Sequence, residues 1–264
     1  MRAMRVLVRS ILVSLVAASS GEAGQSHVAP TGTLRAAYLS NNPAQTVKDS
    51  ATGAIRGVAV DVVRELGRRL GVEVTLTGVQ SPQHVIDAVR TGQADIGFVA
   101  YNPERAGSVE FSQPYMLVQQ TFLVRLNSTI QSVAEIDRPN QKIGAGKGDS
   151  IALYLARTLK QAQLVELTES TLGEATRALL SGALDALGAN RQRLTDALRS
   201  TSGVRLLPDD LYGVEQTIIV PKGDPRRLQV VNEFIDDVRR SGFLRAAIER
   251  SGVVGIAVAP PVLK

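Results

Sequence analysis

Short apolar runs alternate along the chain with segments in which apolar residues recur every three or four positions. The first pattern predicts buried strands and the second predicts amphipathic helices. Glycine ends several of these helices, and Asp-Pro opens one. The pattern predicts strands at 33–39, 72–77, 94–100, 142–145, 164–166 and 184–189, and helices at 58–70, 82–91, 150–161, 170–180, 225–240 and 243–250. Such alternation is typical of an α/β fold with largely parallel sheets.

One stretch of sequence recurs 90 residues later: residues 88–96 (AVRTGQADI) match residues 178–186 (ALLSGALDA). Each copy contains the end of a helix, a glycine, an aspartate and the start of a buried strand. The match has two interpretations. Any helix–Gly–strand unit has this form, or the chain contains two similar α/β lobes with a ligand at their strand ends.

Residues 1–23 have the pattern of a secretory signal peptide. Arg2, Arg5 and Arg9 precede a short apolar segment, residues 11–18, and small residues follow it. This segment is well short of the roughly 20 residues that span a bilayer, although an uncleaved anchor is the alternative. Since the chain has no Cys, we expect no lipid anchor. The sequence therefore predicts a soluble protein of the periplasm.

The composition narrows the classes of function. Hydrophobic residues make up 44% and charged residues 21%, an ordinary globular mixture. The net charge of +5 falls to +3 without residues 1–23, which is too low to favour nucleic acid. With no Trp, five Phe and five Tyr, few side chains can stack on bases or sugars. Because there is no Cys and only His27 and His84, we expect no disulfide, thiolate chemistry, metal site or cofactor.

Several motifs, taken in order, resemble one family. They are GTLRAA (32–37), GVAVDV (57–62), NPER (102–105) followed by VEFSQPY (109–115), and KIGAGKGDS (142–150). Over roughly residues 32–252 the chain resembles the extracellular solute-binding proteins of ABC importers, family 3, of the polar amino-acid type.

The resemblance implies a two-lobed periplasmic-binding-protein fold whose lobes close by hinge rotation. Lobe 1 would comprise residues 33–117 and 217–258, lobe 2 residues 118–216, and a tail residues 259–264, with crossovers at 118–124 and 212–221. Such a protein captures a carboxylate-bearing solute, an amino acid or a similar molecule, between its lobes. It is a monomer without catalytic activity that delivers the solute to the permease subunits of an ABC importer.

The resemblance also implies the residues that bind the solute carboxylate. Arg105 matches the family Arg that holds it through a forked guanidinium; the alternative is a surface Arg. Gly148, Asp149 and Ser150 match a turn that supplies backbone N–H and hydroxyl groups to the same carboxylate, and simple N-capping is the alternative. Asp149 departs from the family pattern, because two carboxylates repel unless one faces away or meets a cation.

The end of the site that binds the solute ammonium departs further. Asn190 stands where the family has an Asp that pairs with the ammonium, and Asn42 stands near the position of a stacking aromatic. Tyr38, Phe98 or Tyr101 could replace that aromatic, and a core position is the alternative for Phe98. Ala100 and Asn102 offer backbone groups. A buried ammonium needs an anion, so we expect a small carboxylate or modified amino acid as ligand, and weak binding of common polar amino acids.

Two other functions remain open on the same scaffold. A dehydratase-like enzyme would need an acid or base at the site, and Asp149 is the remaining candidate. A periplasmic sensor or an orphan binder would share the fold, because fold alone does not define function.

Overall fold

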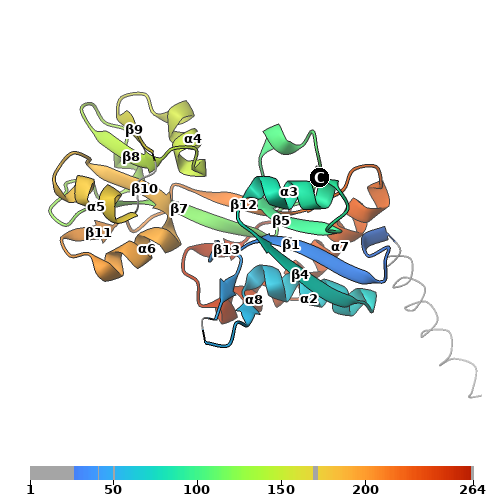
Figure 1. Cartoon of the computed structure of the whole chain (residues 1–264). Helices are drawn as coiled ribbons and strands as arrows, with labels where there is room; N and C mark the ends of the chain where they lie inside the picture. Colours follow the sequence, from blue (N-terminus) through green and yellow to red (C-terminus); the bar gives the residue numbers. More distant parts are fainter. Residues whose placement is uncertain (1–26, 41, 50, 169–171, 263–264) are drawn as a thin grey trace, which may run out of the picture. The chain divides into compact units, whose positions relative to one another are not determined.

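A computed structural model describes residues 27–40, 42–49, 51–168 and 172–262, so the predicted signal peptide lies outside the described residues. The chain divides into two compact units (Figure 1). Unit 1 comprises Met1–Tyr115, Gln216–Ser251 and Val258–Lys264, and unit 2 comprises Met116–Glu215 and Gly252–Ala257. No helix within the described ranges has the length and apolar character needed to cross a membrane.

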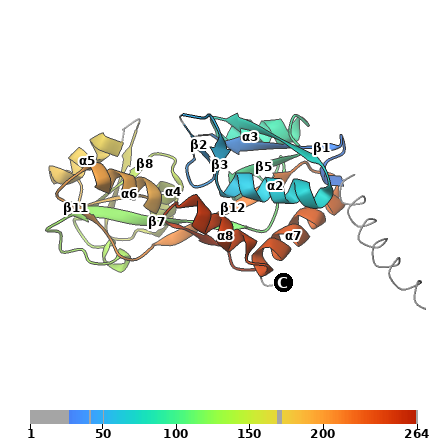
Figure 2. The ribbon, with the colours of Figure 1, turned by 90° about the horizontal axis from the view of Figure 1, so that it is seen from below.

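Unit 1 is built on strands in the order β4-β1-β5-β12, in which β1 is parallel to β4 and β5, and β12 is antiparallel to β5. Helix α3 covers one face of these strands, and α2, α7 and α8 lie on the other (Figures 1 and 2). The elements are β1 (Thr33–Leu39), β2 (Val47–Lys48), β3 (Ile55–Arg56), α2 (Val58–Leu70), β4 (Glu73–Val79), α3 (Pro82–Arg90), β5 (Ile96–Ala100), η1 (Pro103–Arg105), β6 (Glu110–Phe111), β12 (Tyr212–Val220), α7 (Pro225–Arg240) and α8 (Phe243–Ser251).

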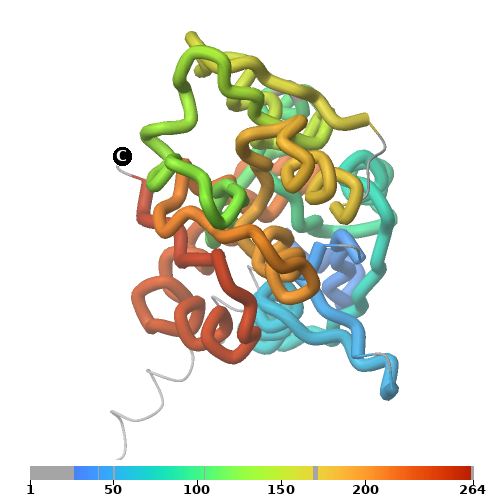
Figure 3. The backbone as a smooth tube through the Cα atoms, turned by 90° about the vertical axis from the view of Figure 1, so that its left-hand side faces the viewer, coloured from blue at the N-terminus to red at the C-terminus, as the bar shows by residue number. Residues whose placement is uncertain are grey.

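Unit 2 has the order β9-β8-β10-β7, with β8 parallel to β9 and β10, and β10 antiparallel to β7. Neighbouring residues on β7 point to opposite faces: Phe122 packs with α4, and Leu123 packs with α5 and α6. Helices α5 and α6 lie side by side in Figure 3. The elements are β7 (Met116–Arg125), η2 (Val133–Glu135), β8 (Lys142–Gly146), α4 (Ser150–Thr158), β9 (Gln163–Leu167), α5 (Leu172–Leu180), β10 (Ala186–Asn190), α6 (Arg191–Ser200), β11 (Val204–Leu206) and β13 (Ile256–Val258).

The predicted α/β class is confirmed, and β1 and α2 have the predicted bounds. Helix α4 is shorter than predicted, since it ends at Thr158 rather than at residue 161. The Asp137 carboxylate accepts hydrogen bonds from the backbone N–H groups of Lys160, Gln161 and Ala162, which turns the chain away from the helix. Helix α6 was not predicted, and the start expected for the helix at 170 lies outside the described residues.

The sequence repeat corresponds to a structural one. Gly92 follows α3 and Gly182 follows α5, both with the left-handed backbone that favours glycine, at φ 74° and 82°. Asp95 and Asp185 then precede β5 and β10, the strands at equivalent places in the two strand orders. The chain therefore contains two similar α/β units, while the ligand at their strand ends stays a prediction.

Candidate functional site

The candidate residues of unit 1 gather at the carboxyl ends of β1 and β5. These strands are parallel neighbours, so their ends share one edge of the sheet, which is where open α/β sheets place ligands. Ala100 ends β5, and Asn102 follows in the loop that leads to η1. The Asn42 side chain accepts a hydrogen bond from the N–H of Ala44 at 3.2 Å and shapes the loop after β1.

Arg105 is the last residue of η1, a single turn closed by a bond from its N–H to the carbonyl of Asn102 at 3.0 Å. Its side chain is half-buried. Among the described residues, no ion pair or hydrogen bond engages its guanidinium. A guanidinium held on a short turn without a partner can take a carboxylate in a forked pair.

Tyr38 does not fill the place of a stacking aromatic. Its side chain is buried, with 6% exposed, and it lies across Gly78 of β4, where a Cβ would come within 2.9 Å of its hydroxyl. Burial raises the pKa of Tyr38. The ring is part of the packing of β1 on β4.

Unit 1 contains a buried amide pair that the sequence does not predict. The Gln45 Nε2 group donates to Oε1 of Gln216 at 2.9 Å, and the two side chains are 0% and 3% exposed. The Gln45 Oε1 atom has no partner within the described part of the chain. Gln216 lies opposite Ala100 in the pairing of β12 with β5, so this pair underlies the end of β5. Gln45 and Gln216 lie on segments far apart in the sequence, so the spacing of apolar residues along the chain could not pair them.

In unit 2, Gly148 turns the chain from β8 into α4 with φ 76°, a left-handed conformation. Asp149 occupies the N-cap position, but its side chain makes no capping hydrogen bond. Ser150 is the exposed first residue of α4. The first N–H groups of α4 are therefore left without a side-chain cap from Asp149, which is the condition in which a helix start favours an anion.

The Asp149 carboxylate turns toward α6 instead. It lies against the backbone of Gly146, where a Cβ would clash, and its Oδ2 is 3.4 Å from Nη1 of Arg193. Burial raises the pKa of Asp149, and the charge of Arg193 opposes that shift. Asp149 thus has a cation as its partner. A cation partner reduces the repulsion that the Asp149 carboxylate would exert on a second carboxylate nearby.

Asn190 ends β10 and is the N-cap of α6. Its Oδ1 accepts a hydrogen bond from the N–H of Arg193 at 2.8 Å, the geometry of a good cap. With its carbonyl engaged, the amide NH₂ is what Asn190 can offer to a ligand. Arg193 was not foreseen, because α6 has only Leu194 and Ala197 buried and gives a weak apolar pattern.

A stacked tyrosine pair in unit 2 was also missed. The ring centroids of Tyr154 on α4 and of Tyr212, in the part of β12 that belongs to unit 2, are 4.4 Å apart, with 17° between the ring planes. Burial, followed by the neighbouring Tyr154, raises the pKa of Tyr212 to about 12. The two residues are 58 positions apart in sequence, so periodicity could not pair them.

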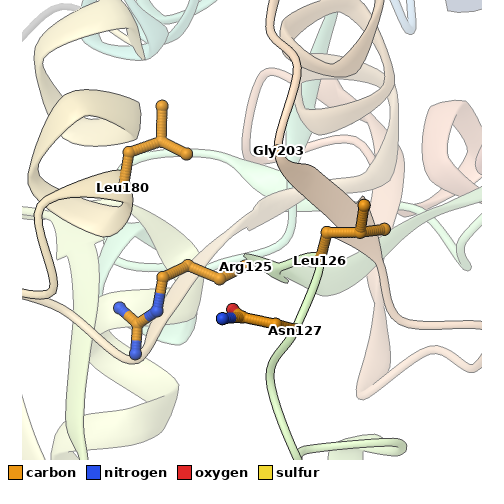
Figure 4. Close-up of a pocket in the computed structure, with 5 residues that line it drawn as sticks. All are labelled: Arg125, Leu126, Asn127, Leu180 and Gly203. Atoms are coloured by element: carbon orange, nitrogen blue, oxygen red, sulfur yellow. The ribbon is translucent and has the colours of Figure 1, made fainter.

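A hollow of about 480 Å³ lies elsewhere on unit 2 (Figure 4). It is lined by Arg125, Leu126, Asn127, Leu180 and Gly203. Val124, the residue before Arg125 on β7, pairs with Ala186 at the start of β10, the end of that strand opposite to Asn190. The Arg125 guanidinium already bonds to the carbonyls of Leu179 and Leu184 and to Asp185, so it holds the fold together. Groups of three or more side chains able to bind a metal are absent from the described residues.

Known proteins similar to this chain belong to the family that the sequence motifs resemble. The family model of bacterial extracellular solute-binding proteins, family 3, matches residues 34–251. A glutamine-binding protein of Geobacillus stearothermophilus is 27% identical over 64% of this chain and 64% of its own length, so the chain spans slightly less than two thirds of that relative.

Two solved structures are similar as well. One is a binding component of an ABC transporter from Wolinella succinogenes in complex with lysine, with a TM-score of 0.65 and 26% identity over 83% of this chain and 95% of that one. The other is an ancestral amino-acid-binding protein described as a precursor of cyclohexadienyl dehydratase, with a TM-score of 0.64 and 25% identity over 84% and 96%. The chain belongs to the bacterial extracellular solute-binding proteins, family 3.

Proposed function

We propose that this protein binds a small carboxylate-bearing solute, an amino acid or a similar molecule, and delivers it to the permease subunits of an ABC importer. The observation that carries the proposal is the Arg105 guanidinium, which has no partner among the described residues although it stands in the family's motif. The relatives support the class of solute, since one is named for glutamine and one structure holds lysine.

In this proposal each unit is described by its own candidate residues. In unit 1, Arg105 forks onto the solute carboxylate. In unit 2, Gly148 and Ser150 stand at the start of α4, whose N–H groups favour an anion. Asn42, Asn102 and the backbone of Ala100 complete the part of the site on unit 1. The protein acts as a monomer in the periplasm after export by its signal peptide, and it needs no cofactor.

The first prediction follows from the charge of Arg105. A thermal-shift screen with L-glutamine, L-arginine, L-cystine, butyrate and glutarate identifies the probe that stabilises the protein most, since binding stabilises by mass action. Arg105→Ala should then weaken binding of that probe by about 2–4 kcal/mol in calorimetry, because it removes a desolvated charge-assisted pair. Arg105→Lys should restore little, because Lys lacks the fork.

Arg90→Ala is the matched control. Arg90 is an exposed arginine of unit 1 that pairs with Asp87 on its own helix, so its loss should leave binding unchanged. If Arg105→Ala and Arg105→Lys both bind like the wild type, the carboxylate site lies elsewhere.

An enzyme of the dehydratase type is the second candidate. It is favoured by one observation, the similarity to a structure described as a precursor of cyclohexadienyl dehydratase. Asp149 is the candidate acid or base, because burial raises its pKa. Nuclear magnetic resonance of a bound cyclic carboxylate over time distinguishes the two: a binding protein returns it unchanged, and an enzyme converts it.

A further inference from the structure

Strand β4 forms one edge of the sheet in unit 1. Among the described residues it pairs with β1 alone, and all seven of its residues pair in parallel register without a bulge. Exposed strand edges are usually protected against further pairing by Lys, Pro, a bulge or a covering element. Strand β4 contains neither Lys nor Pro, and its one charged residue, Glu73, lies at the first position. This edge is therefore able to accept another strand.

The pairing with β1 determines which backbone groups of β4 face the open edge. The carbonyl of Val79 accepts a hydrogen bond from the N–H of Ser40 at 3.0 Å, so the backbone of Val79 faces β1. Backbone groups alternate in direction along a strand, which turns those of Val74, Leu76 and Gly78 away from β1. In the part of the chain that the structure describes, no strand pairs with them. They offer alternating donors and acceptors to an extended chain.

A hollow of about 410 Å³ lies beside this edge, between β4 and α3. Thr77 and Val79 of β4 line one side, and α3 with the turn that follows it lines the other. Helix α3 packs mainly on β1 and β5, which leaves the side chain of Thr77 exposed. Ala88 and Ala94, also in the lining, are only 9% and 3% exposed. The hollow thus combines buried apolar walls with a polar rim, the usual form of a specific pocket.

The rim of this hollow carries a negative charge. Asp87, 41% exposed, belongs to the lining, and neither Lys nor Arg is among the lining residues described. Arg90 reaches Asp87 through one contact of 3.2 Å on the same helix, and such exposed pairs are weak. His84 and Thr91 lie on the same face of α3 at helical spacing and add polar groups. A Lys or Arg side chain in the hollow would gain the Asp87 carboxylate as a partner.

We propose that the β4 edge and this hollow form a docking site for an extended, basic segment of another protein. The segment pairs as a strand with Val74, Leu76 and Gly78 and places a Lys or Arg side chain beside Asp87. In recognition of this kind, main-chain hydrogen bonds supply affinity and a side-chain pocket supplies specificity. The β4 strand of a second copy is a poorer occupant, because it has no basic side chain to offer. The site lies within unit 1 and is independent of solute binding.

Blocked peptides of the same length as β4 test the inference on the exported protein. TVTKTVT and TVTETVT share the alternation of a strand and differ only in the central charge. In fluorescence anisotropy TVTKTVT should bind at least about tenfold more tightly than TVTETVT, because a like charge beside Asp87 is unfavourable. In hydrogen exchange followed by nuclear magnetic resonance, TVTKTVT should slow exchange of the N–H groups of Val74, Leu76 and Gly78 by at least about tenfold.

The edge strand of unit 2, β9, is the internal control for exchange. The carbonyl of Leu167 bonds to the N–H of Lys147 beside β8, so the alternate N–H groups, those of Leu164 and Glu166, face outward. TVTKTVT should leave their exchange unchanged. Equal protection of β9 would mean that the peptide pairs with any open edge, which overturns the inference.

Asp87→Lys should reverse the preference, so that TVTETVT binds more tightly than TVTKTVT. Glu233→Lys is the matched control, because Glu233 is an exposed acid on α7, on the other face of the sheet of unit 1; it should change nothing. Absence of peptide binding by the wild type, or an unchanged preference in Asp87→Lys, contradicts the inference. Sedimentation that shows a dimer, with the same β4 N–H groups protected before any peptide is added, also overturns it, since the occupant is then a second copy.

Discussion

Units 1 and 2 repeat one strand order but hold the repeated aspartate differently. In unit 1 a single residue, Arg35, supplies the Asp95 carboxylate with its backbone N–H at 2.9 Å and its guanidinium at 2.6 and 3.0 Å, and Asp95 is 4% exposed. In unit 2 two different residues bind the Asp185 carboxylate, which is 32% exposed. They are Lys142 on β8, through its backbone N–H, and Arg125 on β7, through its guanidinium. The repeat thus keeps the carboxylate in place while its cation comes from a different strand.

The opposite ends of the same strands differ more. Ala100 and Asn190 end β5 and β10, and each lies opposite a buried glutamine, Gln216 or Gln120, on the antiparallel neighbour. After Ala100 the chain enters a loop and the short turn that carries Arg105, whereas Asn190 caps a helix directly. Unit 1 therefore offers an arginine on a turn that has no partner among the residues described, and unit 2 offers helix starts and an arginine already paired with Asp149.

The largest effect expected concerns the two repeated aspartates. Asp95→Ala should lower the free energy of unfolding by about 3 kcal/mol, because it leaves Arg35 and a buried N–H without their partner. Asp185→Ala should cost only about 1 kcal/mol, since this pair is longer and more exposed. Urea unfolding of the two variants beside the wild type measures both. Equal losses of unfolding free energy in the two variants would show that the deeper burial of Asp95 does not make its pair more stabilising than that of Asp185.

The sequence predicts the inner strands and their helices well, because apolar periodicity and glycine stops report packing and backbone conformation directly. It fails at α6, where seven of the ten residues, from Arg191 to Ser200, are polar or charged. It also fails where a contact joins distant segments, as between Gln45 and Gln216 or between Asp149 and Arg193. Such partners follow from strand order, which a local pattern does not contain.

Local sequence patterns also predict only part of the candidate site, namely the residues whose role does not depend on a distant segment. The motif around Arg105 predicts a binding residue, because the chemistry that it implies is local to one turn. The role of Asp149 could not be read from its motif, because that role depends on a side chain 44 residues away. Asn190 was identified as a departure, yet its bond to the N–H of Arg193 appears only once α6 is known.

The next prediction separates the structural and binding roles of Asn190. Asn190→Ala should lower the free energy of unfolding by about 1 kcal/mol through loss of the helix cap, whereas Asn190→Asp should preserve stability because Asp caps equally well. Asn190→Asp should also raise the affinity for L-glutamine relative to butyrate, since it supplies an anion for the ammonium. Urea unfolding and calorimetry measure the two effects.

Gln192→Ala serves as the control for Asn190, since Gln192 lies on the same turn and, within the described ranges, its side chain bonds only to the exposed Asp196. It should alter neither stability nor selectivity. Unchanged stability in Asn190→Ala would contradict the capping role, and unchanged selectivity in Asn190→Asp would mean that another group neutralises the ammonium.

The smallest effects come from two carboxyl groups whose pKa values shift in opposite directions, one in each unit. In unit 1, Arg68 and then Arg69 bond to Glu65 and lower its pKa from 4.5 to about 2, although burial opposes them. A lowered pKa in the folded state means stability that is present above pH 4.5 and is lost as the pH falls toward about 2. Glu65→Gln should therefore lower the free energy of unfolding by about 1 kcal/mol at pH 7, after allowance for solvent screening, and by almost nothing at pH 2.

In unit 2, burial raises the pKa of Asp149 despite Arg193, which reverses the sign. A carboxyl group that binds its proton more tightly in the folded state costs stability once the pH rises above its unfolded pKa. Asp149→Asn should therefore raise the melting temperature slightly at pH 7 and leave it unchanged near pH 3, the opposite of Glu65→Gln. Thermal melts of both variants at pH 3, 5 and 7 without ligand measure the difference. A lower melting temperature for Asp149→Asn at pH 7 would show that its contact with Arg193 outweighs its burial, and that the two units do not differ in this respect.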